Sequence, residues 1–168
     1  MNKHYILTSI LTMVAVGGLA YPVHGLEQST QLLVQVSGLN ELQGKVCLSL
    51  FDSSTGFPSN GDEAVGSQCV SAIEPVSTAE SDAATQISPD SSSLWVAFEN
   101  LAPGSYAVSV FHDANGDGEF NRHLFGMPAE GFGFSRNPEV RTGPPQFGDA
   151  VVLVAGTETK IEIELNYF

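Results

Sequence analysis

Apolar and polar residues alternate along seven short segments of this chain, and such alternation is typical of half-buried antiparallel β-strands. The segments are residues 31–37, 45–51, 67–73, 93–99, 105–112, 150–154 and 159–165. In the second of them, for example, Val46, Leu48 and Leu50 would share one face. No long stretch carries the 3.6-residue apolar period of a helix. The pattern predicts an all-β protein.

Turn residues separate these segments, and seven short strands punctuated by Gly, Pro and Asn favour a seven-stranded antiparallel β-sandwich of the immunoglobulin-like or transthyretin-like kind. A closed β-barrel is the alternative architecture. The segment 100–106 illustrates the punctuation, because Pro103 and Gly104 suit a tight turn between two strands. Tyr106 would follow this turn and close one end of the sandwich with a bond from its hydroxyl to the backbone.

Two longer segments lie outside the predicted strands. Residues 74–92 are rich in Ser, Thr, Ala and Asp and are expected to form a flexible surface loop. Residues 123–149 carry several aromatic residues among Gly and Pro, so an ordered excursion packed over one end of the sandwich is expected. Phe132 and Phe134 in this excursion would either form an exposed binding surface or cap the core.

The N-terminal residues 1–25 have the features of a secretory signal peptide. Lys3 precedes an apolar run, and Val23 and Gly25 suit a signal peptidase, which predicts cleavage before Leu26. An uncleaved membrane anchor is the alternative, but the run is shorter than the roughly 20 residues that a bilayer requires. Residues 26–168 would then form a single domain, exported to the periplasm or the extracellular space, with no membrane span after cleavage.

The chain is strongly acidic, with 6 Lys and Arg against 19 Asp and Glu and a formal net charge of −13. Such a chain is repelled by phosphate backbones and by anionic lipid surfaces, which argues against nucleic-acid binding. It attracts cations instead. The partner is expected to be a protein, a glycan or another component of the cell envelope.

Cys47 and Cys69 are the two cysteines of the chain. In an exported protein such a pair most simply forms one disulfide. The alternative is two buried free thiols on neighbouring strands.

The acidic segment 112–121 is the best candidate site. Short oxygen-bearing side chains at every other position of a tightly curled loop can point inward together and bind Ca²⁺. The candidate calcium ligands are Asp113, Asn115, Asp117, Glu119 (through its carbonyl) and Asn121. Gly118 would allow the sharp turn.

The segment departs from the calcium loop of helix-loop-helix proteins in two respects. Leu124 occupies the twelfth position, where a bidentate Glu is expected, and a predicted strand rather than a helix precedes the loop. Glu130 is a possible source of the missing carboxylate. The alternative is an ordinary hairpin loop without metal, since Asn-Gly and Asp-Gly are favoured hairpin turns.

His112 and His123 flank the acidic segment, and histidines beside carboxylates can form a zinc or acid–base site. The alternative is that His112 ends a strand and forms local hydrogen bonds. The sequence contains no Gly-x-Ser-x-Gly, His-Glu-x-x-His or phosphate-binding glycine loop.

With these motifs identified, the chain resembles a bacterial secreted family called domain of unknown function 2141. The resemblance rests on the segments 34–39, 44–51 with 56–58, 98–106, 110–118, 125–135 and 145–150. The Phe-x-Asn-Leu-x-Pro-Gly-x-Tyr turn is also similar to the one in transthyretin-like and carboxypeptidase-regulatory domains. The resemblance implies an exported β-sandwich and carries no activity.

Three hypotheses about function follow. The first is a non-enzymatic, calcium-stabilised β-domain with a binding or structural role in the envelope or outside the cell. The second is a small metal-dependent hydrolase centred on His112, Asp113, His123 and Glu130, and the third is a carrier that holds a small ligand inside the sandwich.

Overall fold

All seven predicted strands are present in the computed structural model, which describes residues 29–72, 85–87, 93–141 and 143–168. They are β1 (Thr30–Ser37), β2 (Lys45–Phe51), β3 (Gly66–Ser71), β5 (Leu94–Leu101), β6 (Gly104–Asp113), β8 (Val152–Val154) and β9 (Glu158–Glu164). Two further strands, β4 (Thr85–Ile87) and β7 (Gly131–Phe134), accompany a 3-10 turn η1 (Gly61–Glu63) and a short helix α1 (Phe147–Ala150). The predicted signal peptide, and the predicted flexible loop apart from β4, lie outside the described residues.

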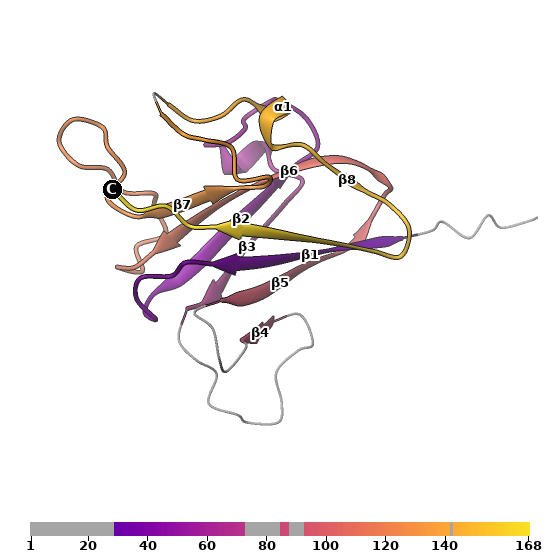
Figure 1. Ribbon diagram of the computed structural model, residues 1–168, viewed down its shortest axis with the longest axis horizontal. Helices are drawn as coiled ribbons and strands as arrows, with labels where there is room; N and C mark the ends of the chain where they lie inside the picture. Colours follow the sequence, from indigo (N-terminus) through magenta and orange to yellow (C-terminus); the bar gives the residue numbers. More distant parts are fainter. Residues whose placement is uncertain (1–28, 73–84, 88–92, 142) are drawn as a thin grey trace, which may run out of the picture.

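The strands form two separate sheets, which confirms the predicted sandwich (Figure 1). One sheet has the order β4-β5-β1-β9, and the other has the order β3-β2-β6-β7, with β8 also paired to β6. Within the described part of the chain, no helix is long and apolar enough to cross a membrane.

The structure differs from the seven-stranded antiparallel arrangement in strand number and in one pairing. Strand β9 runs parallel to β1, with Leu33 opposite Lys160 and Val36 opposite Ile163. Alternation predicts which residues of a strand face the core, but it does not determine the direction of the neighbouring strand. Strand β7 was missed for a related reason, because it is buried at all four residues and therefore does not alternate between apolar and polar positions. Strand β4 lies within the segment 74–92 that was predicted to be a flexible loop, so at Thr85–Ile87 that prediction is wrong.

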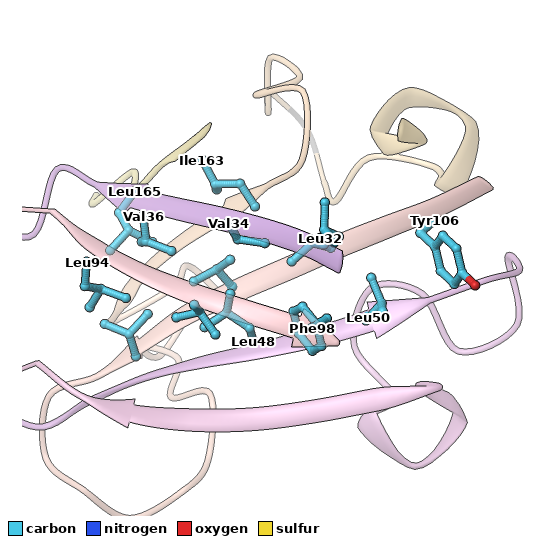
Figure 2. Packing of buried hydrophobic residues seen from close by; sticks show 14 of the residues in the cluster. Leu32, Val34, Val36, Leu48, Leu50, Leu94, Phe98, Tyr106, Ile163 and Leu165 are labelled. Atoms are coloured by element: carbon cyan, nitrogen blue, oxygen red, sulfur yellow. The ribbon is translucent and has the colours of Figure 1, made fainter. Parts of the chain in front are cut away.

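The main core lies between the two sheets and consists mainly of the inward-facing residues of five long strands (Figure 2). Val34 of β1, Leu48 of β2 and Ile163 of β9 are 0 to 1% exposed. Tyr106 closes one end of the core, where its hydroxyl donates a hydrogen bond to the carbonyl of Ala102 at 2.9 Å, as predicted.

A second apolar layer covers part of the outer face of the β3-β2-β6-β7 sheet. Its buried members are Ala107, Phe132, Phe134 and Ala150, with Phe57, Phe120, Val140 and Phe147 packed against them. Several of these rings meet edge to face, including Phe57 and Phe147 at 5.8 Å between centroids. The central strands of this sheet are therefore covered on both sides over part of their length.

The alternating Gly-Phe-Gly-Phe sequence of β7 reflects a close approach of the chain on its inner face. A Cβ atom at Gly131 would overlap the ring of Tyr167, and one at Gly133 would lie 2.7 Å from Cγ2 of Ile163 and 2.8 Å from the carbonyl oxygen of Glu164. The phenylalanines of β7 belong to the outer layer. Glycine is thus required on one face of this strand, and an aromatic ring fills the other.

We expect Gly133→Ala to reduce the free energy of unfolding by about 1–3 kcal/mol, the usual cost of overpacking a filled interior. Urea unfolding followed by circular dichroism measures this change. Gly148→Ala is the matched control, because a Cβ atom there meets nothing within 4 Å. An equal decrease in the free energy of unfolding for the two variants would contradict the close packing described for Gly133.

Candidate metal site in the acidic loop

The acidic loop begins at Asp113, the last residue of β6, whose side chain is fully buried. Its Oδ1 accepts hydrogen bonds from the backbone N–H groups of Gly116 at 2.7 Å and Asp117 at 3.1 Å, and its Oδ2 accepts one from Gly118 at 2.9 Å. Gly116 and Gly118 have φ angles of 77° and 81°, a conformation that glycine adopts without strain. The loop is therefore curled around one carboxylate.

Asp117 lies at the centre of the exposed part of the loop, where two amide side chains converge on its carboxylate. Asn115 donates to Oδ2 at 2.9 Å, and Asn121 donates to Oδ2 at 3.0 Å and to Oδ1 at 3.3 Å. The backbone N–H of Glu119 donates to Oδ1 at 2.8 Å. The Glu119 N–H bond, followed by those from Asn121 and Asn115, lowers the pKa of Asp117.

Glu130 reaches the same loop from the start of β7. Its side chain is only 7% exposed, and its Oε2 accepts a hydrogen bond from the backbone N–H of Asn121 at 3.0 Å. Burial, together with the negative charges of Asp113 and Asp117, raises the pKa of Glu130, although the backbone N–H groups of Asn121 and Ala114 oppose this shift. The residue that the sequence offered as a substitute for the twelfth-position carboxylate thus lies beside the loop.

The residues predicted as calcium ligands are gathered in one loop, but their carboxylates do not converge. Glu119 takes part through its backbone, since its carbonyl accepts from Asn121 at 3.0 Å. In the described part of the chain, no group of three or more His, Cys, Asp or Glu side chains could hold a metal ion. The loop is instead closed by hydrogen bonds from its own amides to its carboxylates.

The two histidines beside the loop are not brought into a common site. His112 is buried, with Nδ1 2.9 Å from the Tyr167 hydroxyl and Nε2 2.8 Å from the Gln43 carbonyl. Since a carbonyl only accepts, Nε2 carries the proton of that bond. His123 is exposed. His112, one residue before the end of β6, therefore forms structural hydrogen bonds, as in the alternative to an acid–base role. Its partners Gln43 and Tyr167 had no recognisable sequence signal.

Phe132 and Phe134 do not form the exposed binding surface that was one expectation. Their side chains are 6 and 8% exposed and belong to the second apolar layer, so they cap an interior instead. The exposed apolar side chains of this region lie elsewhere, at Leu124, Phe125 and Met127, which are 92, 100 and 51% exposed. These three residues occupy a turn that projects from the sandwich between β6 and β7 (Figure 1).

Cys47 and Cys69 form a disulfide between directly opposed residues of β2 and β3, as predicted. It closes a loop of 22 residues, which in the chain-entropy model stabilises a fold by about 3 kcal/mol.

Residues 34–162, more than half of the chain, match the family model described as uncharacterized protein conserved in bacteria (DUF2141). The chain belongs to this family. The matched region of this DUF2141 member includes both cysteines, the acidic loop and Glu130. No curated protein and no solved structure matches the chain. The family match therefore confirms the resemblance drawn from the sequence and leaves the activity open.

The raised pKa of Glu130 gives this DUF2141 domain a testable dependence on pH. The stability that this group contributes is complete below its pKa in the unfolded chain and is lost as pH rises through the higher pKa of the folded state. In a chelating buffer, Glu130→Gln should therefore unfold at a higher temperature than the wild type at pH 7. The two midpoints should converge below about pH 4, where the glutamate is protonated in both states.

Thermal unfolding between about pH 3 and pH 8 tests this expectation, with the exposed Glu99 changed to Gln as the control. A lower midpoint for Glu130→Gln than for the wild type at pH 7 would show that the glutamate stabilises the metal-free fold.

Proposed function

We propose that this protein is an exported, non-enzymatic β-sandwich that serves as a binding or structural domain in the cell envelope or outside the cell, and that its acidic loop takes up calcium. The observation that carries the calcium proposal is the Glu130 carboxyl group. It is buried beside the negative charges of Asp113 and Asp117. Neither ion pair in the described residues, Arg141–Glu139 or Lys160–Glu158, supplies a positive charge to this group.

The chemistry of the loop suits calcium better than zinc or a transition metal. Calcium takes six to eight oxygen ligands, whereas those metals favour nitrogen and sulfur. The loop offers carboxylate oxygens from Asp113, Asp117 and Glu130 and amide oxygens from Asn115 and Asn121. The Glu119 carbonyl, at the seventh position of the loop, adds a further oxygen.

Calcium binding requires a local change of partners. The amides of Asn115 and Asn121 donate hydrogen bonds to Asp117 and so stabilise its negative charge. A cation would replace these donors, and the amides would then present oxygen to the metal. Glu130 would supply the carboxylate that Leu124 cannot, while Asp113 would keep the loop curled through its bonds to Gly116 and Gly118.

Two observations favour a binding role over the metal-dependent hydrolase. Both ring nitrogens of His112 are hydrogen bonded, to Tyr167 and Gln43, and His123 points to solvent. The proposal of export is supported by the Cys47–Cys69 disulfide, because disulfides persist in oxidising compartments.

Thermal unfolding of the protein with calcium, with zinc and with a chelator tests the calcium proposal. Calcium at a hundredfold excess over its dissociation constant should stabilise the folded state by about 2.7 kcal/mol. Asp117→Asn and Glu130→Gln should each remove most of this increase. Asp52→Asn is the matched control, because Asp52 is exposed and lies outside the loop.

A midpoint that is the same in calcium and in chelator would refute the calcium proposal. Stabilisation by zinc alone would instead favour the zinc site that was considered for His112 and His123.

A further inference from the structure

A cleft of about 570 Å³ opens on the outer face of the β3-β2-β6-β7 sheet, a volume within the range of small-molecule sites. It lies outside the sandwich, on the side opposite the main core. Its floor consists of two rows of outward-facing side chains that cross the four strands. The floor residues are Cys69, Cys47, Phe111 and Phe132 in one row and Ser67, Ser49, Ser109 and Phe134 in the other.

The two rows give the floor two different chemical characters. The first is apolar along its whole length, because the disulfide of β2 and β3 is followed by the rings of Phe111 and Phe132. The second presents three hydroxyl groups before it ends at Phe134. Ser49 and Ser67 are 3.1 Å apart at their hydroxyls, and Ser109 donates to the Pro58 carbonyl at 3.0 Å. An apolar strip thus lies beside a polar one.

Arg122 and Arg141 line this cleft, although the chain as a whole is strongly acidic. Among the described residues of its lining, one side chain, Asp62, is acidic. The chain has three arginines, so two of them are at this cleft, and the third, Arg136, lies at a separate hollow beside α1. The cleft therefore brings two guanidinium groups to a floor that is apolar along one of its two rows.

The arginines differ in how firmly they are held. The Arg122 guanidinium lies 5.0 Å from the centre of the Phe120 ring and donates to the Gly126 carbonyl at 3.1 Å, which orients it and leaves further N–H groups available. Arg141 pairs with Glu139 at 2.7 Å, but both side chains are more than 70% exposed. Such an exposed pair contributes little free energy, so a bound anion can take the place of Glu139.

We propose that this cleft binds a small organic anion with an apolar, ring-sized body, which would lie on the disulfide and Phe111 with its anionic group against Arg122 and Arg141. Guanidinium groups bind carboxylates and related anions through paired hydrogen bonds. This inference gives a ligand class to the proposed binding role, and it does not require calcium.

Isothermal titration calorimetry with 2-naphthoate and its uncharged analogue 2-naphthamide tests the proposal, in calcium and again in chelator. The wild type should bind the naphthoate at least tenfold more tightly, as expected for hydrogen bonds between charged groups. Arg122→Gln combined with Arg141→Gln should bring the two affinities close together. Arg136→Gln removes one positive charge outside the cleft and should preserve the difference.

The site itself is tested by Ser67→Trp, which places a large ring over the floor from an exposed position of β3 and should abolish binding of both probes. Amide chemical shifts of the wild type provide a second measurement that does not depend on a variant. They should change on β2, β3 and β6 when the naphthoate is added. Changes confined to the exposed turn at Leu124, Phe125 and Met127 would indicate adsorption there and overturn the proposal.

Equal affinity for the two probes, or no binding of the naphthoate up to about 1 mM, would also overturn it. Binding in both buffers without a calcium effect on stability would refute the calcium proposal and uphold this one. Stabilisation by calcium without binding of the naphthoate in either buffer would uphold the calcium proposal and overturn this one.

Discussion

Strand β6 is buried along most of its length, and the sandwich, the acidic loop and the cleft all depend on this constraint. Its inward residues, such as Val108 and Val110, lie in the main core, while Ala107 on its outer face is fully buried under the second layer. Its backbone pairs with β2 on one side and with β7 on the other, and its first residues also pair with β8. Even Ser135, which is fully buried, accepts from the N–H of Val108 and donates to the carbonyl of Ala150.

The acidic loop follows from the way this enclosed strand ends. Asp113 brings an ionisable group into the interior, and a buried carboxylate without hydrogen-bond donors is costly. The chain supplies three N–H donors by curling back at once, which places Asp117 and Asn121 on the outside of the curl. The same requirement explains why Glu130 accepts the N–H of Asn121. The proposed metal site and the structural loop would therefore share one scaffold, and a cation would act on charges that the fold has already gathered.

The sequence predicted the parts of the fold that depend on one segment at a time. Strands β2 and β6 were recognised because their side chains alternate, and the Cys47–Cys69 disulfide followed from cysteine number and compartment. The parts that depend on distant segments were missed. The requirement for glycine at positions 131 and 133 comes from close contacts with Tyr167 and Ile163, which are distant in the sequence. The acidic motif likewise identified the loop, but the position of Glu130 depends on strand pairing, and the cleft requires rows of residues from four strands.

The parallel pairing of β1 with β9 has a consequence for how the molecule reaches its native state. These strands are separated by residues 38–157, so the pair forms only by closing a loop that contains nearly the whole domain. Proteins dominated by such non-local pairings fold slowly, because the entropy of loop closure is lost before the contacts compensate for it. Until β9 docks, Val34 and Val36 lack their neighbours in the sheet, Ile161 and Ile163. The chain therefore completes its topology only when β9 docks on β1, after the strands that precede it in the sequence have been formed and are waiting for this partner.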